Sequence, residues 1–390
     1  MRARTACTEA KSSAPCGRMP RSPGHRPQAR WYAVPHVRSD QPLSADTRIA
    51  PIRNEDSMND AIKGDPEDDT AQSGLGGSAG FARYDSVLDM CGDASHPTPI
   101  VRVNHMLRIP DVALYVKCEW MNPFGSIKDR TAKWLLQGLA ERGELEGRTV
   151  IEATSGNTGI ALAAICSQLG IPMVATAPHM LSPEKTALLR AFGAEVRLTP
   201  ADDTSGLHPM DVAFRMAEAI RDAEPDIYVM PNQYDNADNA RTHYESTGPE
   251  IWAQTEGRIR YFFAGFGTCG TLVGTSRFLK KMNPDVRVIG IQPVPGHHIS
   301  GLKNMEETAV PANLDMSVID EIVWVDDEMT DECARRLYRE EALMVGPSGA
   351  AIAAGAMKFL AEESRPGIAV AIAPDSGQKA TSYLNEILGY

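Results

Sequence analysis

The feature that most limits the fold is the alternation of short apolar segments with helical segments from about residue 97 onward. Residues 149–152, 172–175 and 194–198 are predicted strands that begin about 22 residues apart. Between them, residues 157–169 are rich in Ala, Ile and Leu, and Ser182 with Pro183 has the sequence of a helix start. Such repeats place strands side by side in a parallel sheet covered by helices. We therefore predict an α/β fold.

A second series of the same kind follows the first. The pattern predicts further strands and helices up to a terminal helix, with strands at 261–264, 286–292 and 368–373 and helices at 237–254, 271–282, 328–342 and 350–363. The sequence contains no internal repeat. Two α/β domains, with a lysine-containing segment near residue 128 between their sheets, form the simplest architecture.

Composition narrows the class of protein. The 390 residues are 43% hydrophobic and 23% charged, which is typical of a soluble globular protein. The chain has no run of eighteen apolar residues, so we expect no membrane span. A net charge of −12 argues against a nucleic-acid partner, which would need a basic surface.

The N-terminal part has a different composition. Residues 1–57 hold ten Lys/Arg against five Asp/Glu, a net charge of +5 that leaves about −17 on the remainder. This segment has no sustained apolar periodicity, and residues 74–80 are rich in glycine. We expect residues 1–84 to be a disordered extension and linker, with Met58 as an alternative start. An organelle transit peptide is the other interpretation.

The seven cysteines are odd in number and scattered, and no C-x-x-C occurs. This pattern predicts a reduced, intracellular chain without a disulfide framework or zinc site, and we expect a cytoplasmic location.

Three segments have the sequence of a chemical site. The first, residues 122–130 (Asn-Pro-Phe-Gly-Ser-Ile-Lys-Asp-Arg), places Lys128 in a short turn before a helix predicted at 131–142. A lysine is a strong nucleophile only when its amine is neutral or already condensed with a carbonyl. Most lysines are simply solvated, so this segment alone decides little.

The second segment is Gly265-Phe266-Gly267-Thr268-Cys269-Gly270-Thr271, which joins a predicted strand to a predicted helix. Glycine lets backbone N–H groups converge on an anion at a helix N-terminus, as in phosphate sites. The string also matches G-x-G-x-x-G, but the next strand ends without the acidic residue that a dinucleotide ribose requires. A phosphate site is therefore favoured over a dinucleotide site or a purely structural turn.

The third segment is Thr154-Ser155-Gly156-Asn157-Thr158-Gly159, again between a strand and a helix. It is suited to a substrate carboxylate, although helix capping by Ser155 or Asn157 explains it equally well. A lysine, a polar glycine turn and a phosphate-type loop are together the parts needed to hold pyridoxal phosphate (PLP).

In this order and spacing the three segments resemble the fold type II (β-family) PLP enzymes, and in particular the cysteine synthase and cystathionine β-synthase group. The resemblance covers about residues 97–390. It extends to further motifs at Asn232-Gln233-Tyr234, at 243–252 (His-Tyr-Glu-Ser-Thr-Gly-Pro-Glu-Ile-Trp), at 345–350 (Val-Gly-Pro-Ser-Gly-Ala) and at 374–377 (Pro-Asp-Ser-Gly).

The resemblance implies a role for each matching residue. Lys128 matches the Schiff-base lysine, Asn157 the residue hydrogen-bonded to the 3′-oxygen of PLP, and Ser348 the residue facing its pyridine nitrogen. The remaining matches fall into two groups, a phosphate cup of Gly267, Thr268, Cys269, Gly270 and Thr271, and a substrate-binding set of Thr154, Ser155, Gly156, Thr158 and Gln233. A neutral Ser348 hydroxyl makes the cofactor a weaker electron sink, which favours β-elimination over a long-lived quinonoid.

Several positions depart from the group. Cys269 stands where glycine is usual, and residues 378–383 (Gln-Lys-Ala-Thr-Ser-Tyr) replace an Arg-Tyr-Leu run. The segment 345–350 is one residue shorter than the common form, which makes the match of Ser348 less secure than that of Lys128. In the expected substrate lid, 296–307, Lys303 resembles the basic residue of members that accept O-phosphoserine. A solvated lysine is the alternative, and His297 and His298 are expected at the surface.

The resemblance implies a two-domain enzyme, with residues 85–132 plus 236–390 as the large cofactor-binding domain and 133–235 as the small substrate-side domain. It implies a PLP-dependent cysteine synthase, which uses O-acetyl- or O-phosphoserine and sulfide through an α-aminoacrylate intermediate, and a homodimer. Homocysteine or an amine as nucleophile, giving cystathionine or a 2,3-diaminopropionate-type product, is the first alternative. A serine/threonine dehydratase and a non-catalytic scaffold that kept the fold are the others.

Overall fold

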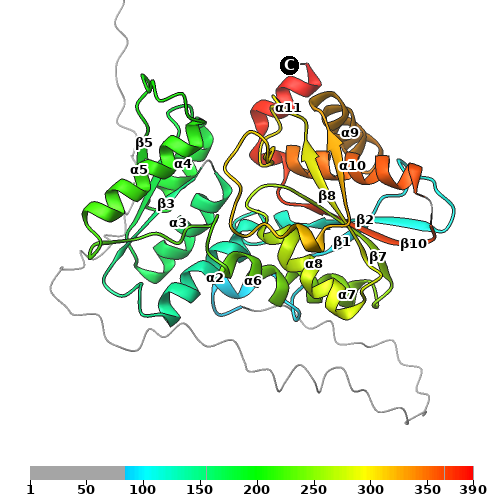
Figure 1. Cartoon of the computed structure of the whole chain (residues 1–390), viewed down its shortest axis with the longest axis horizontal. Helices are drawn as coiled ribbons and strands as arrows, with labels where there is room; N and C mark the ends of the chain where they lie inside the picture. The colour runs from blue at the N-terminus through cyan, green and yellow to red at the C-terminus, as the bar shows by residue number, and fades with distance from the viewer. Residues whose placement is uncertain (1–83, 155, 364, 390) are drawn as a thin grey trace, which may run out of the picture. The chain divides into compact units, whose positions relative to one another are not determined.

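The computed structural model describes residues 84–389, except residues 155 and 364, and its strands form two sheets (Figure 1). The larger sheet has the order β1 (Ile100–Arg102), β2 (Val112–Cys118), β10 (Gly367–Ala373), β7 (Ile259–Gly265), β8 (Arg287–Pro293), β9 (Glu321–Val325). The smaller sheet has the order β5 (Glu195–Leu198), β4 (Met173–Ala177), β3 (Thr149–Ala153), β6 (Tyr228–Val229). All neighbouring strands are parallel except β1 and β2, which confirms the predicted fold class.

An α-helix or a longer connection separates each strand from the next except β1 and β2, as parallel pairing requires. The α-helices are α2 (Lys128–Glu141), α3 (Asn157–Leu169), α4 (Pro183–Ala191), α5 (Pro209–Ala223), α6 (Asp238–Glu245), α7 (Thr247–Gln254), α8 (Gly270–Met282), α9 (Asp327–Glu340), α10 (Pro347–Glu362) and α11 (Thr381–Leu388). Short 3₁₀ helices are η1 (Val87–Met90), η2 (Glu119–Met121), η3 (Met316–Val318) and η4 (Gly377–Lys379). None of the helices in the described part of the chain is long and apolar enough to cross a membrane.

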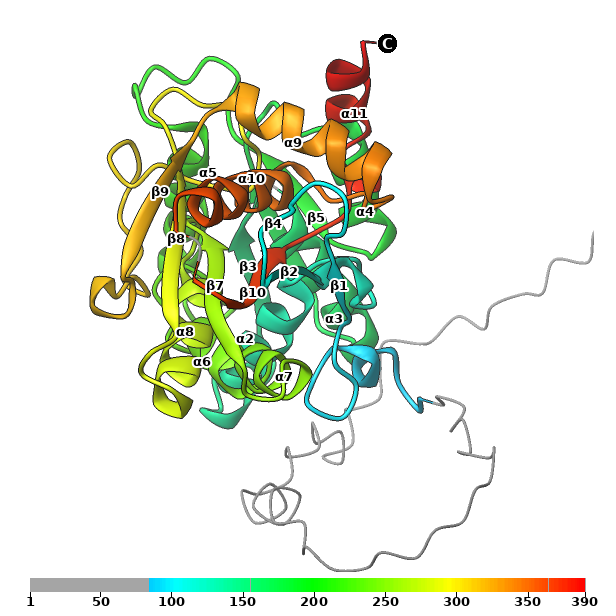
Figure 2. The ribbon, with the colours of Figure 1, turned by 90° about the vertical axis from the view of Figure 1, so that its right-hand side faces the viewer.

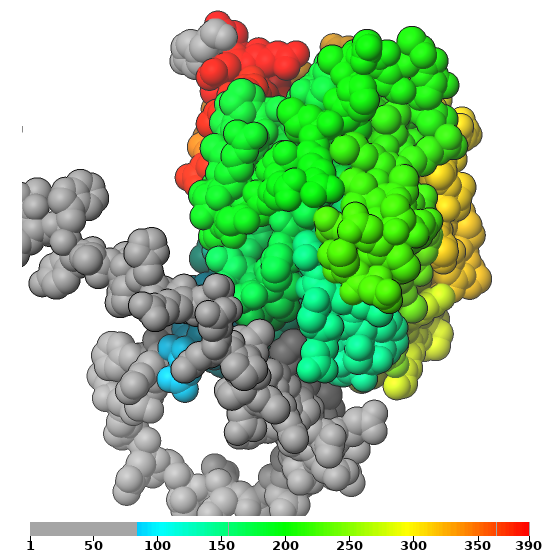
Figure 3. All heavy atoms as spheres, turned by 90° about the vertical axis from the view of Figure 1, so that its left-hand side faces the viewer, coloured from blue at the N-terminus to red at the C-terminus, as the bar shows by residue number. Residues whose placement is uncertain are grey.

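The inner strands β3, β4, β7, β8 and β10 are mostly buried along their length, as expected where helices cover both faces of a parallel sheet, whereas β1 and β5 are largely exposed or half-buried. Helices α9 and α10 lie on one face of the larger sheet, and α7 and α8 lie on the other (Figure 2). Their buried apolar side chains belong to the two hydrophobic clusters that cover these faces. The smaller sheet packs against α3 and α4 on one face and against α5 on the other. The segment around 150–230, green in the space-filling view, makes up most of the face seen in Figure 3.

The larger differences between the predicted elements and the structure are as follows. Lys128 is the first residue of α2 rather than part of a preceding turn, and its N–H donates to the Ser126 hydroxyl (3.2 Å). The helix predicted at 237–254 is two helices, which meet at Ser246 with non-helical backbone angles (φ −125°, ψ −70°). Finally, β1, β2, α5, β6 and β9 were absent from the prediction.

The carboxyl ends of β7 and β10 and the N-termini of α2, α3, α8 and α10 all contribute residues to one cavity of about 740 Å³. Ligands of α/β proteins typically bind at the carboxyl ends of parallel strands, and a cavity of this volume is within the usual range for a small-molecule site. The fold therefore directs attention to this cavity.

Candidate functional site

Lys128 lies in the wall of this cavity, at the start of α2. Its segment is fixed from both sides, because the Ile127 N–H donates to the carbonyl of Pro374 (2.9 Å) and Ser126 forms a bridge with Asp375. Burial lowers the pKa of the Lys128 amine, and the nearby Asp375 and Cys269 oppose this shift. A lowered pKa increases the fraction of neutral amine, which is the nucleophilic form.

The glycine loop after β7 lies against the same cavity. Gly267, Thr268, Cys269 and Thr271 line it, whereas Gly270 is the first residue of α8 behind them. Gly270 has no room for a side chain, because an added Cβ would lie 2.0 Å from Asn239 Oδ1. Cys269 has a left-handed backbone (φ 62°), a conformation that glycine adopts without strain. The loop thus presents backbone and hydroxyl donors at a helix N-terminus, as a phosphate requires.

The two threonines of this loop have polar partners beneath the cavity. Asn239 Nδ2 donates to Thr268 Oγ1 (3.0 Å), and Thr271 Oγ1 pairs with His243 Nε2 (3.2 Å). Burial lowers the pKa of His243 to about 3, so its imidazole is neutral at physiological pH. These partners orient the hydroxyls without adding a charge to the loop.

The loop that follows β3 contributes a second polar wall. Thr154, Gly156, Asn157 and Thr158 line the cavity, and Ser155 lies outside the described residues. Gly156 is the N-cap of α3 and Asn157 its first residue, and Thr154 Oγ1 accepts hydrogen bonds from the N–H groups of Gly156 (3.2 Å) and Gly159 (2.9 Å). Asn157 and Thr158 are thereby left to face the cavity.

Gln233, more than 70 residues away in sequence, completes this wall. Thr158 Oγ1 donates to Gln233 Oε1 (2.7 Å), and both side chains are buried. The structure therefore brings together two residues that the sequence analysis assigned to substrate binding from separate motifs.

Ser348 and the segment 296–307 lie on the remaining side. Ser348 is the second residue of α10, is buried, and lines the cavity. The segment is tied to the phosphate-type loop, because the Lys303 N–H donates to the carbonyl of Phe266 (2.9 Å). The Lys303 ammonium lies 4.3 Å from the ring centroid of Tyr234, at the cavity wall and not in bulk solvent. His297 also lines the cavity and is half-buried, so the expectation of a surface position is correct for the exposed His298 alone.

Two residues without a predicted role contact Asn157. Asn157 Nδ2 donates to Asp375 Oδ2 (2.6 Å), and Lys379 Nζ donates to Asn157 Oδ1 (3.4 Å) and to the carbonyl of Phe124 (2.5 Å). Burial raises the pKa of Asp375 and lowers the pKa of Lys379. Both residues lie in segments that the sequence singles out, Asp375 in the matching motif 374–377 and Lys379 in the departing segment 378–383. The sequence does not indicate that either residue contacts Asn157.

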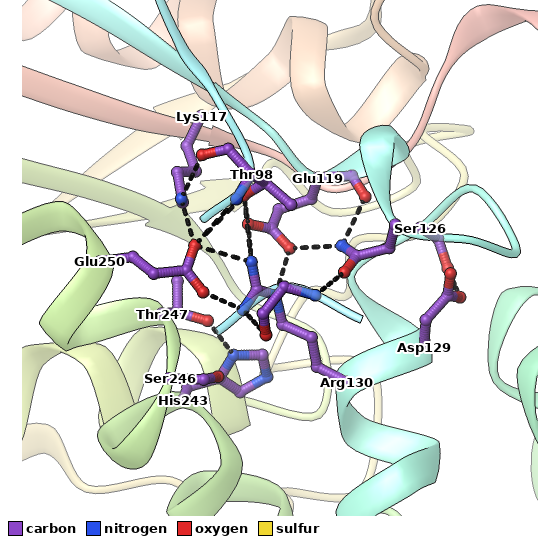
Figure 4. A network of polar contacts seen from close by, with 12 residues as sticks. Thr98, Lys117, Glu119, Ser126, Asp129, Arg130, His243, Ser246, Thr247 and Glu250 are labelled. Atoms are coloured by element: carbon purple, nitrogen blue, oxygen red, sulfur yellow. Dashed lines mark hydrogen bonds and ion pairs between the residues drawn. The ribbon is translucent and has the colours of Figure 1, made fainter. Parts of the chain in front are cut away.

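A buried charge network lies behind the site and explains Arg130, which follows Lys128 by two residues (Figure 4). Arg130 Nε donates to Glu119 (2.7 Å), its Nη1 donates to Glu250, and Lys117 Nζ donates to Glu250 (2.5 Å). All four side chains are at most 1% exposed. The two cations and two carboxylates balance in charge, so the network fixes the start of α2 against β2 and α7 without a net buried charge.

The residues present fit PLP. An amine with a lowered pKa and a glycine loop suited to a phosphate face one cavity, and an amide able to donate to a phenolic oxygen lies beside them. No cluster of three or more potential metal ligands occurs among the described residues. When bound, PLP would supply an electron sink for bond breaking at the α- and β-carbons of an amino acid.

Comparisons with known proteins agree with this fit. Residues 93–375 match the family model described as pyridoxal-phosphate dependent enzyme. The chain is 40% identical to the cysteine synthase of Aquifex aeolicus (strain VF5), over 76% of this chain and 90% of the relative. It is similar to the crystal structures of an O-ureido-L-serine synthase (TM-score 0.70, 34% identity, 78% and 96% coverage) and of the Entamoeba histolytica cysteine synthase (TM-score 0.71, 25% identity, 83% and 99% coverage).

The family match spans most of the chain and includes every site segment described above except Lys379 and the residues around it. The expected family, enzyme class and cofactor are thereby confirmed. The chain belongs to the pyridoxal-phosphate dependent enzymes, and its similar relatives include several named cysteine synthase.

Proposed function

We propose that this enzyme is a cysteine synthase that replaces the activated β-hydroxyl of O-acetyl- or O-phospho-L-serine with sulfide. The observation that carries the proposal is the meeting of Lys128, the glycine loop at 267–271 and the polar loop at 154–158 in one cavity. The Aquifex aeolicus relative named cysteine synthase supports the same reaction, because the chain covers 90% of its length.

Each wall of the cavity has a proposed task. The loop at 267–271 would hold the phosphate, and Asn157 would donate to the phenolic oxygen of the cofactor. The residues proposed to hold the α-carboxylate of the amino acid are Thr154, Ser155, Gly156, Thr158 and Gln233. Ser348 would face the ring nitrogen, and the neutral hydroxyl there would keep that nitrogen unprotonated.

Lys128 Nζ is the proposed base. Held at the start of α2, it would remove the proton from the substrate Cα, and the departing acetate or phosphate would leave from Cβ. The burial that lowers its pKa favours the form that can accept this proton. Sulfide would then add at Cβ, and Lys128 would return the proton to Cα.

The position of Lys303 bears on the identity of the leaving group. Lys303 lies at the cavity wall against Tyr234, where an ammonium would meet a phosphate leaving group more favourably than a neutral acetyl group. We propose O-phosphoserine as a substrate on this basis.

A nucleophile other than sulfide is the main alternative to this proposal. One similar structure is an O-ureido-L-serine synthase, so a nucleophile other than sulfide is compatible with this architecture. Homocysteine or an amine as nucleophile, or the release of product as a dehydratase, would keep the same residues at Cα and Cβ.

The test is a product assay on the purified enzyme with PLP. O-acetylserine, O-phosphoserine and serine are each supplied with sulfide, homocysteine or a primary amine, and the amino-acid products are separated by chromatography. The proposal predicts cysteine as the main product from an O-activated serine, and Lys303→Met should reduce kcat/KM for O-phosphoserine more than for O-acetylserine. Pyruvate, cystathionine or a 2,3-diaminopropionate-type amino acid as the main product would contradict the cysteine synthase assignment.

We also propose that the enzyme is a cytoplasmic homodimer with the domain boundaries given above. The family resemblance supports the dimer, and the two sheets, with residues 149–229 in the smaller one, support the division into domains.

A further inference from the structure

The side-chain amide of Asn157 is held at both ends by groups of the segment that follows β10. Its Nδ2 donates to Asp375 Oδ2 (2.6 Å), and its Oδ1 accepts from Lys379 Nζ (3.4 Å). A carboxylate accepts and an ammonium donates, so these two neighbours permit a single orientation of the amide. The amide of Asn157 therefore has a defined orientation before any ligand is considered.

Lys379 is itself anchored. Its Nζ donates to the carbonyl of Phe124 (2.5 Å), and its methylene chain lies beside Gly125, where an added Cβ would be 3.0 Å from Lys379 Cε. Gly125 has φ 81°, so both its backbone conformation and the neighbouring lysine favour glycine. Lys379 thus joins three parts of the site, namely the turn before Lys128, the start of α3 and the segment after β10.

Asp375 is equally constrained. Gly346 packs directly against the Asp375 side chain, since a Cβ added at Gly346 would lie 2.1 Å from Asp375 Oδ1. The Gly346 N–H also donates to the backbone carbonyl of Asp375 (2.9 Å). Asp375 Oδ1 is buried and has no hydrogen-bond partner among the described residues. The carboxyl group is therefore held in place by packing, and its one side-chain hydrogen bond within the described part of the chain is with Asn157.

An amide nitrogen carries two N–H groups, and Asp375 uses one of them. Among the described residues no second acceptor faces Asn157 Nδ2, and Asn157 lines the cavity. We propose that Lys379 and Asp375 are positioning residues, which fix the Asn157 amide so that its second N–H donates to the phenolic oxygen of the bound cofactor. This role would explain the lysine in residues 378–383, where the chain departs from the usual Arg-Tyr-Leu run.

This inference rests on the proposed role of Asn157, but it is independent of the nucleophile and leaving group. Its test therefore uses cofactor binding without any amino-acid substrate. The affinity for PLP is measured by titration of the apoenzyme, and the visible absorbance maximum of the bound cofactor is recorded for Lys379→Met, Asn157→Ala and the double variant. Lys379→Arg tests rescue, Lys358→Met on the outer part of α10 is the matched control, and the thermal midpoint of each apoenzyme reports folding.

Lys379→Met is expected to weaken PLP binding about tenfold and to shift the absorbance maximum, because the hydrogen bond of Asn157 is lost with its orientation. In the Asn157→Ala background the same change should have no further effect. Lys379→Arg should restore most of the affinity, and Lys358→Met should match the wild type. If Lys379→Met does not fold, Asp375→Asn is tested in the wild-type and Asn157→Ala backgrounds, with the same expected results for PLP affinity and absorbance.

Independent, additive losses in the double variant would overturn the positioning role, as would an unshifted spectrum in Lys379→Met. A normal spectrum and affinity in Asn157→Ala would remove the role of Asn157 and this inference with it. Failure to form cysteine in the product assay would leave the cofactor result unaffected, so the two proposals fail separately.

Discussion

At the scale of single residues, the site depends on charges that are buried in balanced sets. Arg130 and Lys117 face Glu119 and Glu250, and the charge and hydrogen bonds of Arg130 lower the pKa of Glu119 to about 2 against the opposing effect of burial. Removing one member of such a set leaves an uncompensated buried charge, which costs far more than the intact set contributes.

Arg130→Met is therefore expected to lower the free energy of unfolding by about 3–5 kcal/mol. Urea unfolding followed by circular dichroism measures this change. The matched control is Arg258→Met, which breaks an exposed pair with Glu256 (2.7 Å) and should cost less than about 1 kcal/mol. Similar losses of unfolding free energy in the two variants would show that the buried network contributes no more to stability than an exposed ion pair.

The residue scale also shows where sequence reasoning stops. Lys128, Asn157 and the loop at 267–271 were predicted because each belongs to a short motif. Glu250 and Lys117 are 133 residues apart, and Lys379 and Asn157 are 222 apart, so no local pattern reveals either contact. Pairings of this kind are decided by the fold and appear only in three dimensions.

At the scale of elements, the ends of strands and helices were predictable where a local physical cause fixes them. The predicted helix 157–169 coincides with α3, and Ser182 caps α4 as expected. Strand β2 was absent from the prediction because the buried Lys117 interrupts its apolar run. Helix α5 was absent because its cap is His208, whose Nδ1 accepts from the Met210 N–H (3.2 Å), an unusual residue for a helix start.

Glu152 connects two elements of the smaller sheet and makes stability depend on pH. Its carboxyl group, in β3, accepts hydrogen bonds from the N–H groups of Asn232 (2.9 Å) and Gln233 (3.2 Å) after β6. Burial raises its pKa from 4.5 to about 7, so the folded state retains a proton that the unfolded state releases. Its contribution to stability is complete below pH 4.5 and is lost as the pH rises to about 7, by up to about 3 kcal/mol.

Glu152→Gln is expected to flatten the pH dependence of the unfolding free energy between pH 4.5 and 7, because the amide does not titrate. Urea unfolding at several pH values measures the slope. The control is Glu306→Gln, an exposed position that should keep the slope of the wild type. An unchanged slope in Glu152→Gln would assign the pH dependence to other groups.

At the scale of the whole molecule, residues 84–98 complete the buried network. The carbonyl of Gly92 accepts from Arg130 Nη1 (2.6 Å), that of Leu88 accepts from Lys133 Nζ (3.1 Å), and Thr98 Oγ1 donates to Glu119 (2.7 Å). An added Cβ on Gly92 would lie 2.3 Å from Arg130 Nη2, so this backbone lies directly against the guanidinium. The segment before β1 is therefore part of the packed structure.

Two truncations separate this segment from the residues before it. A chain that begins at Met58 is expected to keep the urea midpoint and PLP affinity of the full chain, because residues 1–57 have no composition suited to a core. A chain that begins at residue 94 loses the Gly92 acceptor. Its free energy of unfolding should fall by on the order of 1–3 kcal/mol, which lowers the urea midpoint. Equal midpoints for all three chains would contradict the role given to residues 84–93.

We propose that Lys128 carries the cofactor, in a cavity that Lys185, Lys303 and Lys379 also line. Borohydride reduction of the PLP-loaded enzyme fixes the cofactor on its lysine, and mass spectrometry of the digested protein identifies the peptide. We expect one modified peptide, the one containing Lys128, and none in Lys128→Ala. Cofactor found on Lys185, Lys303 or Lys379, or no modified peptide in the wild type, would contradict it.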